Sequence, residues 1–453
     1  MKSINPKNNE LIKSYEILSA KELGNKIDQS HSSFLSWKQT TFSERANLMK
    51  AVAKELIAQK EELAVLMANE MGKPLSEGRS EIEKCSKVCE FYAEKAEAFL
   101  KPEIIDASFE KSYVNYSPLG VVLAIMPWNY PFWQVFRFAA PTLMAGNTAL
   151  LKHAENVSGC SLAIEKIFEK VGFPKAVFSS LLINIEMSES VIENPKVRAV
   201  TLTGSTKAGK AVAALAGKNL KKTVLELGGN DAYIVFKDAN LPLAAKKICQ
   251  SRLLNNGQSC IAAKRFIVHE TIVDDFTKLL IEEMKGYKVG DPLLSDTQIG
   301  PMAREDLRDE VHKQVKASID NGAKCLIGGK LTDKEGAFYP ITLLTGVKKG
   351  MPAFDDEIFG PVGAIISFNS DDEAISLAND SGFGLGGGLF TKDIAKAEKI
   401  AREKFNSGAC FINDFTKSDP KLPFGGIKDS GYGRELSHFG IKEFMNAKTI
   451  CIS

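Results

Sequence analysis

The chain has 453 residues, with 58 Lys and Arg against 56 Asp and Glu, so its formal net charge is only +2. This balance excludes a chain-wide electrostatic field that would attract nucleic acid or an anionic membrane surface. The length favours about two or three domains, and no apolar run is long enough to cross a membrane. We therefore expect a small molecule, with no nucleic acid and no membrane, as the partner of this protein.

The cysteines and the first residues indicate the compartment. Eight cysteines are too sparse in a chain of this length to form a disulfide framework, and Met1–Pro6 lacks the apolar segment of a secretory signal. Cys85 and Cys89 lie one helical turn apart, but no second pair or nearby His completes a metal site. The sequence therefore predicts a cytoplasmic protein with no bound metal.

Residues 1–100 predict mostly helix. Thr41 and Glu44 have the spacing of a capping box, and an apolar stripe that begins at Leu48 continues until Gly72 and Pro74 end the helix. Residues 104–118 are short, polar and bounded by prolines, as in a protruding β-hairpin. Residues 444–453 end in another strand-like stretch that has no obvious partner. A neighbouring subunit or an edge strand of the same chain could pair with it.

From Gly120 onward, short apolar runs alternate with amphipathic stretches. This βαβ alternation predicts a parallel, doubly wound sheet with helices on both faces. A second α/β pattern begins at Phe266–Val268 and continues to about Gly408. The predicted strands are 121–126, 148–152, 176–182, 198–202, 223–225 and 233–236, and the predicted helices are 133–144, 161–171 and 208–216.

Cys260 is the leading candidate for a catalytic residue. It follows a run of amides, Gly and Ser, whereas a structural cysteine usually stands among aliphatic residues. A cysteine nucleophile needs a base and donors for the oxyanion that it creates. Glu226 is a candidate base, and the Asn129 carboxamide at a strand end is a candidate oxyanion donor. Taken alone, Cys260 also fits a structural cysteine near a polar loop, and Asn129 fits a residue that stabilises a turn.

Further candidates stand where strands end. Gly204 and Ser205 close a strand and open a helix, so they fit either a diphosphate site or an ordinary helix cap. Lys152 and Glu155 follow another strand and are candidate partners of a ribose or a phosphate, although charges at strand ends are usually solvated. No histidine forms a recognisable catalytic arrangement with a Cys, Ser or Asp in the sequence.

Together these segments resemble the aldehyde dehydrogenase superfamily over essentially the whole chain. The motifs that carry the resemblance are Pro127-Trp128-Asn129, Lys152, Gly204-Ser205, Glu226–Gly229, Gly257–Cys260, Glu357–Pro361 and Pro423–Gly426. The resemblance implies an α/β fold in three parts. These are a Rossmann-like cofactor domain (1–103 and 119–227), an α/β catalytic domain (228–428) and a small β oligomerisation element (104–118 and 429–453) that builds a homodimer or homotetramer.

The resemblance also implies a mechanism and its residues. Cys260 attacks the aldehyde carbonyl, Asn129 and the Cys260 backbone N–H hold the oxyanion, and Glu226 activates the water that hydrolyses the resulting thioester. NAD(P) accepts the hydride. The cofactor-binding residues implied are Met126, Pro127, Trp128, Lys152, Glu155, Gly204, Ser205, Leu227, Gly228, Glu357 and Phe359.

Two finer expectations concern the cofactor and the substrate. The Glu155 carboxylate would repel a 2′-phosphate, which favours NAD over NADP, although Lys207 adds positive charge nearby and His153 replaces the Pro usual in the family. The sequence also resembles a subgroup of succinate-semialdehyde dehydrogenases in which Arg137 would bind the substrate carboxylate, assisted by Ser259 and Ser418. Here Leu254 replaces the second arginine of other such enzymes.

Four alternatives to these interpretations stay open at the level of sequence. The first is that Arg137 is a surface or interface charge on its helix. The second is another small aldehyde, such as glutarate semialdehyde or lactaldehyde. The third is a coenzyme-A-acylating dehydrogenase, against which the presence of Glu226 argues. The fourth is a non-catalytic binding protein on the same fold, against which Cys260, Glu226 and Asn129 together argue.

Overall fold

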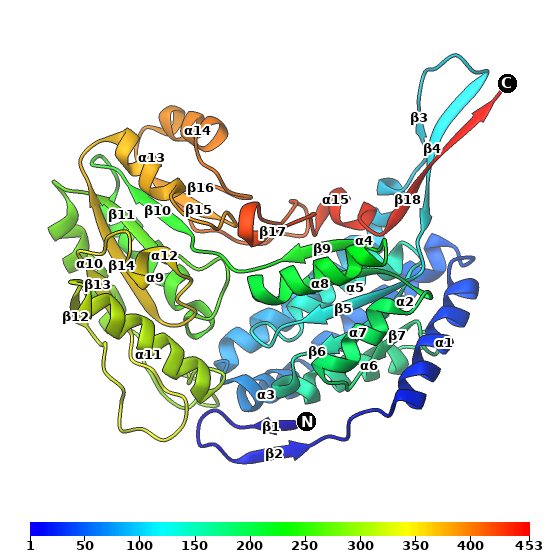
Figure 1. The fold of residues 1–453 in the computed structure, drawn as a ribbon, viewed down its shortest axis with the longest axis horizontal. Coiled ribbons are helices and arrows are strands. Elements are labelled where there is room, and N and C mark those ends of the chain that lie inside the picture. Colours follow the sequence, from blue (N-terminus) through cyan, green and yellow to red (C-terminus); the bar gives the residue numbers. More distant parts are fainter.

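The computed structural model describes residues 1–453 and contains two large sheets and a projecting arm (Figure 1). A small antiparallel pair of strands and four helices precede the first sheet. Ser19 and Thr41 both form capping boxes with the glutamate three residues later, as the sequence predicts for Thr41. These N-terminal elements are β1 (Lys2–Ile4), β2 (Leu11–Ser14), α1 (Ala20–Trp37), α2 (Phe42–Ala58), α3 (Lys60–Met71) and α4 (Leu75–Phe99).

The six-stranded sheet has the order β17-β9-β8-β5-β6-β7, and all of its strands are parallel except β17, which pairs with β9 in the antiparallel sense. Its strands are β5 (Val121–Met126), β6 (Thr148–His153), β7 (Phe178–Ser180), β8 (Val197–Thr203), β9 (Lys222–Glu226) and β17 (Gly431–Tyr432). The helices between them are α5 (Trp133–Met144), η1 (Glu155–Val157), α6 (Ser158–Lys170), α7 (Ile185–Glu193) and α8 (Thr206–Lys218).

The seven-stranded sheet has the order β12-β13-β14-β11-β10-β15-β16, and only β12 is antiparallel to its neighbour. Its strands are β10 (Ala232–Val235), β11 (Arg265–His269), β12 (Lys324–Ile327), β13 (Thr342–Thr345), β14 (Val362–Phe368), β15 (Gly387–Phe390) and β16 (Phe411–Ile412). The accompanying helices are α9 (Leu241–Leu253), η2 (Leu254–Gly257), α10 (Val273–Lys285), α11 (Glu305–Asp320), α12 (Pro352–Asp355), α13 (Asp371–Asn379) and α14 (Ile394–Glu403).

Side-chain alternation explains why both sheets are covered on both faces. In β5, Val122 and Ala124 belong to the largest core cluster, whereas Val121 and Leu123 belong to a separate one. Neighbouring residues of β10 likewise divide between two clusters. Because successive side chains of a strand point to opposite faces, each sheet has an apolar core above and below it. This confirms the predicted doubly wound α/β architecture.

The arm is a three-stranded antiparallel sheet of β3 (Glu103–Ile104), β4 (Lys111–Pro118) and β18 (Met445–Ile452). It extends away from the side of the molecule that holds the six-stranded sheet (Figure 1). The strand-like tail thus has a partner within the chain, because β18 pairs with β4 from Met445–Pro118 to Ile452–Lys111. That the arm joins subunits stays a prediction.

The structure adjusts several predicted boundaries. The expected strand 176–182 is shorter in the structure and extends only over Phe178–Ser180. It cannot begin at Ala176, because this residue has a positive φ of 63°. Residues 429–444, which the sequence groups with the arm, contain most of η3 (Lys428–Ser430), β17 at the edge of the six-stranded sheet, and α15 (Ser437–Lys442). No helix is long and apolar enough to cross a membrane.

Candidate active site

Cys260 stands in a loop with an uncommon backbone conformation. Asn255, Asn256 and Gly257 have φ values of 57°, 57° and 74°, in the left-handed region that Asn and Gly tolerate best. A Cβ atom on Gly257 would lie 2.4 Å from the carbonyl carbon of Gly360. Glycine at this position therefore allows the two loops to pack together and fixes the place of Cys260.

The amides of this loop bind one another and Asn129. Asn255 Nδ2 donates to the carbonyl oxygens of Asn129 and Gln258 at 2.7 and 3.0 Å. Asn129 Nδ2 donates to the Gln258 carbonyl at 3.2 Å, whereas its buried Oδ1 has no partner. The run of amides is buried, and Cys260 lies half-buried at its end.

Glu226 ends β9 inside the molecule, with only 2% of its surface exposed and with no hydrogen-bond partner for either carboxylate oxygen. Burial raises the pKa of this carboxyl well above its usual range, and the nearby Glu435 adds to the shift, while Arg137 and Arg434 oppose it. A Cβ atom on Gly425 would lie 2.7 Å from Glu226 Oε1. The glycines after Phe424 therefore let the chain pass close beside this carboxylate.

Arg137 forms an ion pair with Glu435 inside the protein, where 2% and 6% of the two side chains are exposed. The guanidinium lies 4.8 Å from the centre of the Phe424 ring, and its Nη2 donates to Thr203 Oγ1 at 3.4 Å. Burial raises the pKa of the Glu435 carboxyl, and Arg137 opposes that rise. Arg137 is therefore an interior residue, and the alternative that it is a surface charge is wrong.

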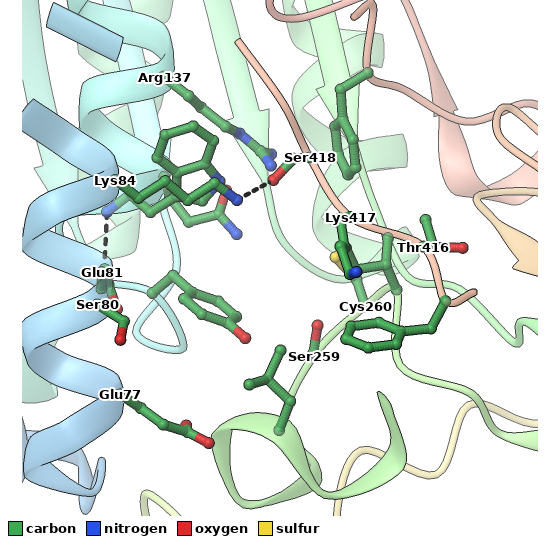
Figure 2. A pocket seen from close by; sticks show the side chains of 17 residues that line it. Glu77, Ser80, Glu81, Lys84, Arg137, Ser259, Cys260, Thr416, Lys417 and Ser418 are labelled. Atoms are coloured by element: carbon green, nitrogen blue, oxygen red, sulfur yellow. Dashed lines mark hydrogen bonds between the residues drawn. The ribbon is translucent and has the colours of Figure 1, made fainter. Parts of the chain in front are cut away.

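A cavity of about 230 Å³ adjoins Cys260, and all three residues expected to bind the substrate line it. Arg137 and Ser418 extend into one part of it, and Ser259 lies on the opposite side (Figure 2). The remaining lining residues come from α4, from the start of α5, from η2 and from three loops: Glu77, Ser80, Glu81, Lys84, Tyr130, Trp133, Gln134, Leu254, Ile261, Phe415, Thr416, Lys417 and Phe424.

A second cavity has a volume of about 250 Å³. Cys260 and Gln134 line both this cavity and the first one. Its further lining residues are Pro127, Trp128, Asn129, Thr203, Gly204, Ser205, Leu227, Gly228, Leu307, Glu357 and Phe359. Ser205 caps α8 by accepting from Ala208 N–H at 3.2 Å, so the start of a helix opens onto this cavity. A helix N-terminus, two glycines and a carboxylate are a donor and acceptor set that fits a dinucleotide.

Three residues expected in this set do not line the cavity. The Met126 side chain is buried in the largest core cluster, because it faces the helices that cover the sheet. Lys152 lies in β6, beside β5, and is 8% exposed, whereas Glu155 is exposed at the start of η1. The Met126 side chain is therefore unable to contact a cofactor in this cavity. Lys152 and Glu155 lie at the carboxyl end of β6, toward which a longer ligand would extend.

His153, which departs from the family pattern, has a structural role. Its Nδ1 accepts from Ala154 N–H at 2.9 Å, so the proton resides on Nε2, which donates to the Pro131 carbonyl at 2.8 Å. Burial lowers the pKa of His153 to about 4. The neutral ring therefore braces the loop that carries Asn129.

Lys264 forms hydrogen bonds to the loop that carries Cys260, and the sequence did not suggest this role. Its Nζ donates to the carbonyl oxygens of Ser259 and Cys260 at 3.1 and 2.7 Å, and it pairs with Glu357 at 3.3 Å. Burial raises the pKa of the Cys260 thiol to about 12, and the charges of Arg137 and Lys264 oppose this shift. In this structure the thiol is consequently protonated at neutral pH.

Comparison with known proteins identifies the family. Residues 1–450 match the model of the aldehyde dehydrogenase family. The chain belongs to this family. It is 46% identical to a probable succinate-semialdehyde dehydrogenase [NADP(+)] of Synechocystis and 45% identical to succinate-semialdehyde dehydrogenase [NADP(+)] 1 of Mycobacterium tuberculosis, with 100% of this chain and 99% of each relative covered.

Solved structures agree with this assignment. The succinic semialdehyde dehydrogenase of Streptococcus pyogenes in complex with NADP⁺ has a TM-score of 0.97 at 37% identity, with 100% of this chain and 99% of that chain covered. A succinate-semialdehyde dehydrogenase of Burkholderia pseudomallei has a TM-score of 0.97 at 33% identity, with 100% and 94% covered. The predictions of the family, of the fold and of an NAD(P)-dependent aldehyde dehydrogenase are confirmed.

Sequence reasoning missed several residues of this aldehyde dehydrogenase site. The sequence motifs identified neither Glu435 nor Lys84 as a residue of the site. Lys84 stands in the middle of α4, where an amphipathic pattern predicts only that some lysines face solvent. No local signal separates it from those lysines, because its position depends on how α4 packs on α5.

The raised pKa of the Cys260 thiol predicts slow alkylation of the free aldehyde dehydrogenase at neutral pH. Because the thiolate is the nucleophile, the rate constant for iodoacetamide should rise roughly tenfold per pH unit from about pH 7 to 10. Mass spectrometry of the Cys260 peptide measures it, and the exposed Cys451 of the same chain provides the reference. A rate that is already constant below pH 8 would contradict the prediction.

Proposed function

We propose that this enzyme oxidises succinic semialdehyde to succinate. The observation that carries the proposal is the cavity beside Cys260, in which a buried arginine and the Ser418 hydroxyl can hold a carboxylate while Cys260 meets the aldehyde. Arg137 uses Nε for Glu435 and Nη2 for Thr203, which leaves Nη1 to donate to a ligand. The substrate named for the relatives supports the same choice.

The first catalytic step is attack of Cys260 on the aldehyde carbonyl. The Cys260 thiol must lose its proton, and the positive charges of Arg137 and Lys264 favour the thiolate. Asn129 Nδ2 and the Cys260 backbone N–H donate to the oxyanion that forms. Asn129 is suited to this role because its Nδ2 donates to the Gln258 carbonyl and its backbone carbonyl accepts from Asn255 Nδ2, so both are held in place before the substrate arrives.

NAD(P)⁺ supplies the hydride acceptor when it is bound in the second cavity, where Gly204, Ser205 and Glu357 would hold it. Glu226 then removes a proton from a water molecule, which attacks the thioester carbon and releases the carboxylic acid. A carboxylate with a raised pKa is a stronger base than an exposed one, and the burial of Glu226 provides this property. The overall reaction consumes one water and releases two protons.

The direct test is an assay of the purified enzyme with succinic semialdehyde and with butanal, which has the same chain length and no carboxylate. We expect kcat/KM to be roughly 10- to 100-fold higher for the semialdehyde, the range for hydrogen bonds to a charged group. Equal values for the two aldehydes would refute the proposed substrate and would leave the family assignment intact.

Glu226→Gln tests the role of the base. The variant keeps the size of the side chain but cannot accept the proton of water, so acyl-enzyme should accumulate. We expect a burst of reduced cofactor close to one equivalent per active site, followed by a steady-state rate lower by roughly 10²–10⁴-fold. Stopped-flow absorbance measures both phases. An unchanged steady-state rate would remove Glu226 from the mechanism.

For the cofactor, we propose that NADP⁺ is preferred. The expected preference for NAD rested on the Glu155 carboxylate and is not supported by relatives that are named for NADP(+). Glu155 is exposed, so water weakens but does not abolish its repulsion of a 2′-phosphate, as it weakens the attraction by the exposed Lys207. Lys152 at the end of β6 and Lys207 at the start of α8 supply positive charge on either side of β5.

The ratio of kcat/KM for NADP⁺ to that for NAD⁺ should therefore exceed one. Glu155→Ser should raise this ratio, and Lys207→Gln should lower it by roughly five- to tenfold, because each change alters one charge near the 2′-phosphate. Activity with NAD⁺ is the control for both variants. A ratio below one in the unaltered enzyme would restore the preference that the sequence predicted.

A further inference from the structure

Lys84 is a cavity residue for which the mechanism above has no use. It belongs to α4, its side chain is half-buried, and its Nζ points into the cavity that adjoins Cys260 (Figure 2). Nζ lies 4.0 Å from the centre of the Trp133 ring and donates to Ser418 Oγ at 2.6 Å. The cation therefore stands beside one of the two groups already assigned to the substrate carboxylate.

The charges around the cavity leave a role for a second cation. The positive charge of Arg137 is neutralised by Glu435 within the protein, and Lys73 and Glu81 form another buried pair. Lys417 also lines the cavity, but it pairs with Asp414 at 2.7 Å. Lys84 forms no ion pair, so its charge is the one available to an incoming anion.

The geometry points to Lys84 as a specificity-determining residue that, with Ser418 and Arg137, binds the distal carboxylate of the aldehyde substrate. This inference rests on the proposed substrate and deepens it. The Arg137, Ser418 and Lys84 side chains extend toward one another from three separate elements (Figure 2). An ammonium donates up to three hydrogen bonds, so Nζ can keep its bond to Ser418 and also bind a carboxylate oxygen.

The titration of Lys84 gives the inference a second consequence. Burial and, to a smaller extent, the charge of Arg137 lower the pKa of this lysine to about 8, while the acidic groups nearby oppose the shift. The charged or titratable groups around it are Arg137 on α5, Glu81 and Cys85 on α4, and Asp419 in the loop after β16. The charge of Lys84 is therefore present below about pH 8 and is lost as the pH rises through that value.

The test compares Lys84→Met with Lys84→Arg and with Lys87→Met. Methionine keeps an unbranched chain over Trp133 but has no charge. We expect Lys84→Met to raise KM for succinic semialdehyde roughly 10- to 100-fold with kcat within about threefold, and to change KM for butanal less than about twofold. Lys84→Arg should retain most of the preference. Lys87→Met removes an exposed lysine of the same helix, which lines neither cavity, and should affect neither aldehyde more than about twofold.

The pH profile separates substrate binding from a purely structural bond between α4 and the loop of Ser418. In the unaltered enzyme, the ratio of KM for the semialdehyde to KM for butanal should increase above about pH 8, where Lys84 loses its charge. In Lys84→Arg the ratio should stay constant to higher pH. Taking the ratio cancels the titration of Cys260, because that thiol attacks both aldehydes.

The outcomes separate this inference from the proposed function. If the unaltered enzyme does not prefer the semialdehyde, the proposed substrate fails, and the role of Lys84 fails with it. If the unaltered enzyme has the preference and Lys84→Met retains it, only the role of Lys84 is overturned. An equal loss of activity toward both aldehydes would also overturn it, because a structural role predicts that result.

Discussion

The buried ion pair between Arg137 and Glu435 is the interaction on which the active site depends. Removing two charges from water costs several kcal/mol per ion, and the protein recovers this cost only if the pair is kept close and in good geometry. Arg137 comes from α5, and Glu435 comes from the segment between β17 and α15. The pair therefore requires the C-terminal segment to pack beside α5 and the six-stranded sheet, although the two residues are far apart in the chain.

The same pair sets the electrostatics of the catalytic groups. Arg137 opposes the rise in pKa that burial causes at both Cys260 and Glu226, whereas Glu435 adds to the rise at Glu226. A thiol that must lose a proton and a carboxylate that must accept one thus share a single cation. Glu435 also offsets part of the charge of Arg137, which is consistent with the second cation that we propose at Lys84.

Backbone conformation provides the second constraint. Three consecutive residues with positive φ deliver Cys260 to the point where the two cavities meet. Lys264 ties the carbonyl oxygens of this loop to Glu357, a residue of the second cavity. The loop of Cys260 and the wall of the second cavity are therefore joined by one buried side chain.

The sequence by itself determined the doubly wound architecture, because apolar alternation and strand-to-helix spacing are local properties that burial on both faces enforces. Through the resemblance to the aldehyde dehydrogenase superfamily it also pointed to Cys260, Glu226 and Asn129, whose catalytic roles stay predictions. Only the tertiary structure decided which charges meet. The pairing of Arg137 with Glu435, the support from Lys264 and the entry of Lys84 into the cavity depend on contacts between distant elements. An exposed lysine and a buried one carry the same local signal, so packing alone distinguishes them.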